Sequence, residues 1–94
     1  MYSKKTEIIN KSGIHARPGS AFVREAKKFV SNITITKLDA EDNPVKSCSA
    51  KSLVLVMAMM LSKGTHIELS ASGEDEQAAV DTLAALVDSG LNEL

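Results

Sequence analysis

The chain has 94 residues, 44 % of them hydrophobic, a formal net charge of −1 and a single cysteine, Cys48. These values predict one small folded domain over residues 1–94, and they exclude intrinsic disorder and an internal disulfide. A nearly neutral charge argues against nucleic-acid binding. The amino terminus lacks the apolar core of a signal peptide and the longest apolar run has nine residues, so we expect a cytoplasmic protein without membrane insertion.

The first elements are predicted to be a strand over residues 2–10, a turn at Gly13 and a helix over about residues 16–28. Apolar residues recur at helical spacing here, with basic residues between them. The residues expected to bury the inner face of the helix are Phe22, Ala26, Phe29 and Val30.

His15 and Arg17 lie where this loop becomes a helix, and the following Pro18 suits the first helical turn. The first N–H groups of a helix are unpaired and carry a partial positive charge, which favours a bound anion. A neutral imidazole is also a good nucleophile. The pattern therefore indicates a nucleophile beside a phosphate site. The alternative is that His15 is an ordinary polar residue at the surface, as a histidine near a helix start usually is.

The charge distribution supports an anion site in this part of the chain. Residues 1–30 carry seven Lys or Arg and two acidic residues, a net +5, whereas residues 31–94 carry four basic and ten acidic residues, a net −6. A positive field around His15 favours acidic partner surfaces.

A β-hairpin is expected next. Residues 33–38 alternate and are rich in β-branched side chains, so they predict a strand. The acidic segment 39–44 ends in Asn-Pro and is typical of a turn, and residues 45–49 return as a third strand.

Ser52 has the residue type preferred at a helix N-cap. The apolar run 53–61 that follows suits a buried helix or a buried strand equally well. Gly64 after it is typical of the residue that ends a helix. Residues 66–71 alternate as a fourth strand, and apolar spacing predicts a last helix over about residues 75–90.

Residues 13–18, with the sequence GIHARP, resemble the active-site signature of the HPr family, the histidine-containing phosphocarriers of the bacterial phosphoenolpyruvate:sugar phosphotransferase system. Residues 49–53 resemble the family's second signature, at the start of its short middle helix. Residues 69–76 resemble its last strand and the beginning of its final helix. The three blocks occur in the family's order and span most of the chain.

This resemblance implies an α+β fold of the open-faced β-sandwich type, with the order βαββαβα. Four antiparallel strands would form the sheet, and three helices would cover one face, so that run 53–61 begins as a short helix. The side chains expected on the open face are Thr34, Thr36, His66, Glu68 and Ser70.

The resemblance also implies a function. His15 would accept a phosphoryl group on Nδ1 from phosphorylated enzyme I and pass it to sugar-specific EIIA domains of sugar permeases, which supports sugar uptake. Arg17 would hold the phosphate oxygens. The chain would be a monomeric, stoichiometric carrier, neither an enzyme nor in need of a cofactor or metal.

A regulatory site and a partner surface are implied as well. In many members a serine at the place of Ser52 is phosphorylated by an HPr kinase/phosphorylase, although a plain N-cap explains this serine equally well. About half of Leu53, Val54, Met57 and Met60 are expected in the core and the rest on the surface. The predicted partner surface consists of Arg17, Ala21, Arg24, Lys27, Leu53, Val54 and Met57.

Three departures from the family pattern leave alternatives open. Gly19 and Ser20 replace a common alanine pair, and Leu55 and Met60 stand where a glycine or polar residue is usual. A nitrogen-branch or regulatory HPr paralogue would fit these changes, and the sugar and acceptor domain stay undetermined. A non-enzymatic adaptor domain, in which the methionine-rich patch is functional and His15 incidental, is the alternative from another class.

Overall fold

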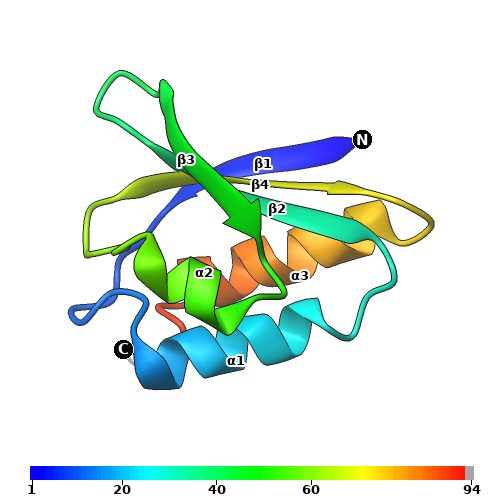
Figure 1. The fold of residues 1–94 in the computed structure, drawn as a ribbon, viewed down its shortest axis with the longest axis horizontal. Helices are drawn as coiled ribbons and strands as arrows, with labels where there is room; N and C mark the ends of the chain where they lie inside the picture. The colour runs from blue at the N-terminus through cyan, green and yellow to red at the C-terminus, as the bar shows by residue number, and fades with distance from the viewer. Residues whose placement is uncertain (93–94) are drawn as a thin grey trace.

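Four strands form one antiparallel sheet, and three helices lie against one of its faces (Figure 1). The computed structural model describes residues 1–92. In chain order the elements are β1 (Tyr2–Glu7), α1 (Ala16–Ala26), β2 (Asn32–Leu38), β3 (Pro44–Ser49), α2 (Leu53–Ala58), β4 (His66–Ser72) and α3 (Glu76–Asp88). The predicted βαββαβα order and the α+β open-faced sandwich are confirmed.

The strand order across the sheet is β1-β4-β2-β3, so the two central strands come from distant parts of the chain. Alternate residues of β2 and β4 point into the core, and Ile33, Ile35, Ile67 and Leu69 are at most 2 % exposed. Their neighbours along each strand face the open side. This period of two is the one that the sequence predicted.

Helix α1 ends earlier than predicted, and Val30 is not part of the core. Phe22 and Ala26 are fully buried and Phe29 packs partly against the core, but Val30 is 73 % exposed. After the helix the chain runs along the Asp75 carboxylate, which accepts a hydrogen bond from the Val30 N–H at 2.9 Å. The expectation for Val30 was therefore wrong, because α1 ends at Ala26 and the Val30 N–H bonds to Asp75, 45 residues away, in place of a helical carbonyl.

Helix α2 has the predicted start. Ser52 is its N-cap, and the Ser52 hydroxyl accepts a hydrogen bond from the Leu55 N–H at 3.3 Å. The helix ends at Ala58, well before Gly64. The Lys37 ammonium group donates to the Met59 carbonyl at 3.0 Å, which satisfies one of the carbonyls left free at the helix end.

Val56 in α2 and its C-cap residue Met59 enter the core, and neither belongs to the set that the sequence singled out. Val56 is 0 % and Met59 is 2 % exposed, whereas Val54 is 77 % and Met60 is 76 % exposed. Met57 is also exposed, and Leu53 packs partly against the core. Residues three apart face the same side of a helix, so Val56 and the C-cap residue Met59 lie together on the buried side of α2.

The chain after α2 adopts an unusual backbone conformation. Met60 has φ +54°, the left-handed region that favours glycine. A side chain there costs about 1–2 kcal/mol relative to the right-handed conformation. Because the Met60 side chain is mostly exposed, burial in the core does not offset this cost.

Strand β1 is fastened to α3 by polar contacts at the surface. Asp81 accepts a hydrogen bond from the Tyr2 hydroxyl at 2.9 Å and forms an ion pair with Lys4 at 2.8 Å. The hydrogen bond from Lys4, followed by that from Tyr2, lowers the pKa of Asp81.

Helix α3 is the longest, with 13 residues, and no helix within residues 1–92 is long and apolar enough to cross a membrane.

Candidate functional site

His15 is the N-cap of α1, as the sequence predicted, and its side chain is exposed. Its backbone is extended, and its carbonyl accepts the first helical hydrogen bond from the Gly19 N–H at 2.6 Å. No acidic residue lies in the first turn of α1. The partial positive charge of the helix start is therefore available to an anion beside His15.

The loop before His15 is held against the segment that follows α2. The Ile14 N–H donates to the Leu61 carbonyl at 2.8 Å, and the Asn10 side-chain amide donates to the Gly13 carbonyl at 2.7 Å. Gly13 has φ +68°, and a Cβ atom at this position would lie 2.3 Å from the Leu61 oxygen. Asn10 is completely buried, and no pattern in the sequence pointed to it.

Arg17 is in the first turn of α1, two residues after His15, and both side chains are exposed. Pro18 between the arginine and the body of the helix is buried and fixes this turn. The structure thus brings an imidazole and a guanidinium group to the same exposed helix end. A guanidinium group can bind two oxygens of a phosphoryl group at once.

An apolar hollow of about 260 Å³ lies beside His15. Its lining residues are Ser12, Ile14, His15, Met57, Met60, Leu61 and Ser62. His15 and Met57 were predicted site residues, and the hollow brings them together. Met60 belonged to the apolar set that was expected to be divided between core and surface, and it was also noted as a departure from the family pattern, but nothing in the sequence indicated that Leu61 would contact the loop.

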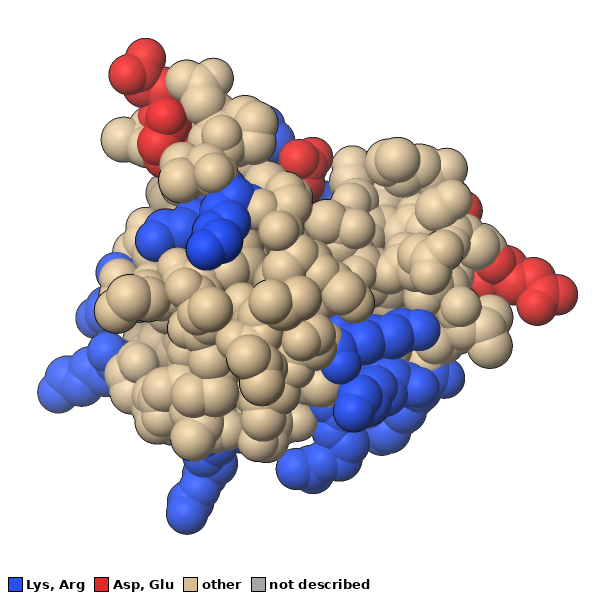
Figure 2. Space-filling view, in the orientation of Figure 1, with Lys and Arg blue, Asp and Glu red and all other residues tan. Residues whose placement is uncertain are grey.

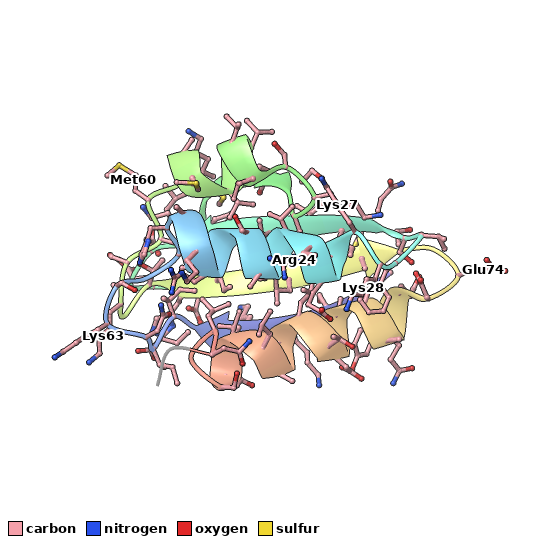
Figure 3. All side chains as sticks on the ribbon, turned by 90° about the horizontal axis from the view of Figure 1, so that it is seen from below. Arg24, Lys27, Lys28, Met60, Lys63 and Glu74 are labelled. Atoms are coloured by element: carbon pink, nitrogen blue, oxygen red, sulfur yellow. The ribbon has the colours of Figure 1, made fainter. Side chains whose placement is uncertain are left out.

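Helices α1 and α2 meet at Gly19. A Cβ atom there would lie 3.2 Å from Leu53 Cδ1, so the missing side chain permits close packing. Next to this contact a second depression, of about 280 Å³, is lined in part by Arg24, Lys27 and Leu53. Three residues of the predicted partner surface are therefore neighbours, and Figure 3 shows Arg24 over the last part of α1 and Lys27 near its end.

The surface over α2 is uncharged and ringed by basic side chains. Figure 2 shows this broad patch, with Lys and Arg at its edges and the acidic atoms toward the hairpin and the end of β4. The exposed apolar residues of the patch are Val54, Leu55, Met57 and Met60. Ala21, the remaining predicted partner residue, is half-buried on α1. A partner with an apolar centre and an acidic rim would complement this surface.

His66, the other histidine, has the opposite surroundings. Its Nε2 lies 3.5 Å from the Glu7 carboxylate and its Nδ1 lies 3.6 Å from the Asp42 carboxylate. Two carboxylates beside an imidazole would repel a phosphoryl anion. The surroundings therefore distinguish the two histidines: the helix start favours an anion beside His15, and the carboxylates oppose one beside His66.

The remaining reactive residue types do not form a site of their own. No group of three or more His, Cys, Asp or Glu residues within the described part of the chain could hold a metal ion. Burial raises the pKa of the Cys48 thiol, whose sulfur lies 3.2 Å from the Met59 sulfur. A raised thiol pKa opposes nucleophilic reactivity at neutral pH.

Comparisons with known proteins match nearly the whole chain. Residues 2–89 match the family model described as the PTS HPr component phosphorylation site. The phosphocarrier protein HPr of Haemophilus influenzae is 49 % identical over 87 residues, which cover 93 % of this chain and 95 % of the relative. A multiphosphoryl transfer protein of the same organism is 40 % identical over 86 residues, which cover 92 % of this chain but 17 % of the relative. The crystal structure of HPr-C-His from Thermoanaerobacter tengcongensis has a TM-score of 0.86 and 37 % identity, and the match covers 100 % of this chain and 99 % of that one.

Proposed function

Because this chain belongs to the HPr family of phosphocarriers of the phosphotransferase system, we propose that it relays a phosphoryl group through His15. The observation that carries this proposal is the position of His15 at the start of α1, in a first turn without acidic residues. Arg17, exposed in the same turn, supplies a second positive group for the phosphoryl oxygens.

The chemical step is an exchange of one bond for another. The Nδ1 atom of a neutral His15 attacks the phosphorus, and the bond from phosphorus to the donor breaks as the new N–P bond forms. The helix N–H groups and Arg17 stabilise the oxygens of the transferred group. Because His15 is exposed at the rim of a shallow hollow, an acceptor can approach it and take the group.

The partners follow from this relay. We assign phosphorylated enzyme I as the donor and EIIA domains of sugar permeases as acceptors, docked on the surface that Arg17, Ala21, Arg24, Lys27, Leu53, Val54 and Met57 form. The carrier is used stoichiometrically, as a single monomeric domain, and is not itself an enzyme. Its support of sugar uptake is part of the same proposal.

Ser52 is proposed as a regulatory phosphorylation site for an HPr kinase/phosphorylase. Its hydroxyl caps α2 and is only partly buried. A phosphoryl group there would place negative charge beside the basic rim of the partner surface, and it would weaken the docking of an acidic partner.

The experiment is intact-mass measurement after incubation with phosphoenolpyruvate and a catalytic amount of enzyme I. One acid-labile phosphoryl group is expected on the wild type and on His66→Ala, the matched control, and none on His15→Ala. No gain on the wild type with a cognate enzyme I would refute the carrier function. A gain on His15→Ala, or an acid-stable gain, would refute the assignment to His15 and point to another residue such as Ser52.

A further inference from the structure

Asn10 is a polar side chain that the fold buries completely, in the loop between β1 and α1. Asparagine is usually exposed, and burial of its amide group costs free energy unless the group forms hydrogen bonds. Within residues 1–92, Ser31 is the other buried polar residue, and its hydroxyl donates to Asp75 at the start of α3. Asn10 instead lies five residues before His15, and its hydrogen bonds lead toward the proposed phosphoryl site.

The amide of Asn10 holds the peptide unit that joins Gly13 to Ile14. Its Nδ2 atom donates to the Gly13 carbonyl at 2.7 Å, and the N–H of the same peptide unit, on Ile14, donates to the Leu61 carbonyl at 2.8 Å. A peptide unit is planar, so hydrogen bonds at its two ends fix the direction of the whole plane. The Asn10 carbonyl also accepts a hydrogen bond from the Gly13 N–H, at 3.1 Å. The chain therefore enters His15 in one fixed direction.

The two ends of the loop are anchored to the same neighbouring segment. Ile8 accepts a hydrogen bond from the Gly64 N–H at 2.7 Å, and its own N–H donates to the Thr65 carbonyl at 2.9 Å. Figure 1 shows the loop between β1 and α1 beside the segment that follows α2. Backbone contacts thus hold both ends of the loop, and the Asn10 side chain connects its middle to Gly13.

The direction of the chain at His15 matters for the chemical step. His15 is the N-cap of α1, so its imidazole and the unpaired N–H groups of the first turn lie at the same helix end. Transfer requires the Nδ1 atom in line with the phosphorus while these N–H groups face the phosphoryl oxygens. In such an arrangement a displacement of about 1 Å can lower the rate about 100-fold. The proposed docking surface, in contrast, consists of side chains on α1 and α2 and does not include this buried amide.

We propose that Asn10 is a positioning residue for phosphoryl transfer, which sets the direction of His15 through the peptide unit between Gly13 and Ile14. The Asn10 side chain is fully buried, so it does not contact a partner and acts through the backbone alone. Without its amide, this peptide unit keeps the bond to Leu61 and can turn about it. The imidazole then adopts several directions relative to the helix N–H groups, and fewer of them are productive. The inference rests on the proposed function, and the kinetic experiment separates the two.

The test measures single-turnover transfer from phosphorylated enzyme I to an excess of carrier, at increasing carrier concentration. The limiting rate constant reports the chemical step, and the half-saturating concentration reports docking. Asn10→Leu replaces the amide by an apolar group of similar size, whereas Asn10→Ala removes its volume as well. Both variants are expected to lower the limiting rate constant about tenfold, with less than about a twofold change in the half-saturating concentration. An equal loss in the two variants identifies the hydrogen bond, and not the packing, as its cause.

The matched control for stability is Val80→Ala in α3. It removes volume from a fully buried side chain in another part of the fold, so it lowers the urea midpoint without changing the loop. Its limiting rate constant is expected to equal that of the wild type. Rates are compared under conditions in which urea unfolding shows the proteins to be folded. If one Asn10 variant does not fold, the other is compared with Val80→Ala alone.

Three outcomes would refute the inference while the carrier function stands. The first is a limiting rate constant in the Asn10 variants that equals the wild-type value, whether or not the half-saturating concentration rises. The second is a loss in Asn10→Ala that Asn10→Leu does not share, because packing would then be its cause. The third is an equal loss in Val80→Ala, because lower stability would then explain the effect. No transfer to the wild type would instead refute the proposed function.

Discussion

Replacing Gly13 by alanine should move the loop before His15 away from Leu61 and Ser62, in the segment that follows α2. A Cβ atom at Gly13 would lie 2.3 Å from the Leu61 oxygen and 2.8 Å from the Ser62 Cα atom, and both of these are backbone atoms. Neither can rotate away, so the two segments have to move apart. The hydrogen bond from the Ile14 N–H to the Leu61 carbonyl, 2.8 Å long, lies in the path of this movement.

The magnitude follows from three terms. Alanine at φ +68° costs about 1–2 kcal/mol, and the smaller entropy of the unfolded chain returns about 0.4–1 kcal/mol. Displacement of the backbone and the weakened buried hydrogen bond add about 1–3 kcal/mol. The net loss of stability for Gly13→Ala is therefore about 3 kcal/mol at the middle of these ranges, which together span about 1–5 kcal/mol.

Gly64→Ala is the matched control. Gly64 also has a positive φ, +91°, but among the described residues no atom beyond its chain neighbours lies within 4 Å of the place that a Cβ atom would take. The control therefore carries the backbone cost alone, a net of about 1 kcal/mol. Urea unfolding of both variants, with equal m-values, gives the difference between them. If Gly13→Ala is no less stable than Gly64→Ala, the loop is not held against Leu61 as described.

Three further changes test other parts of the structure. The Ser31 hydroxyl and nearby N–H groups lower the pKa of Asp75, so the stabilisation from its charge is present above pH 3.8 and is lost as pH falls through the lower folded value. Asp75→Asn should therefore reduce stability at pH 7 and flatten the decline of urea midpoints below about pH 4, and an unchanged pH profile would contradict this. Val56→Ala should cost about 2 kcal/mol in urea unfolding, because Val56 is buried, whereas Val54→Ala should cost less than about 0.5 kcal/mol, because Val54 is exposed. Equal losses of stability would contradict this difference in burial. Ser52→Ala should cost about 0.5–1 kcal/mol, whereas Ser52→Asn should retain most of the wild-type stability, since asparagine also caps helices.

Local patterns in the sequence were enough to predict most elements. The alternation in β2 and β4 identified which side chains are buried, because a strand has only two faces. The type of residue at position 52 predicted a cap, because capping is a local interaction. His15 and Arg17 were placed at a helix start for the same reason, from the proline and the apolar spacing after them.

The errors have a common cause in contacts between distant residues. The end of α2 could not be read from an apolar run without periodicity, since it is set in part by Lys37, which reaches from β2 to the Met59 carbonyl. The exposure of Val30 depends on Asp75 at the start of α3. The positive φ of Met60 was not predicted, although the family pattern has a glycine or polar residue at this place and glycine adopts such a φ readily.

The strand order has a consequence for how the protein is made. Strand β1 leaves the ribosome well before its partner in the sheet, β4, which begins at His66. The loop before His15 likewise needs the Leu61 carbonyl. Contacts between such distant residues slow folding, because a long loop must close before they form. A nascent chain that ends before Leu61 therefore cannot assemble the loop. The loop before His15 therefore becomes native only after the segment that follows α2 has been made.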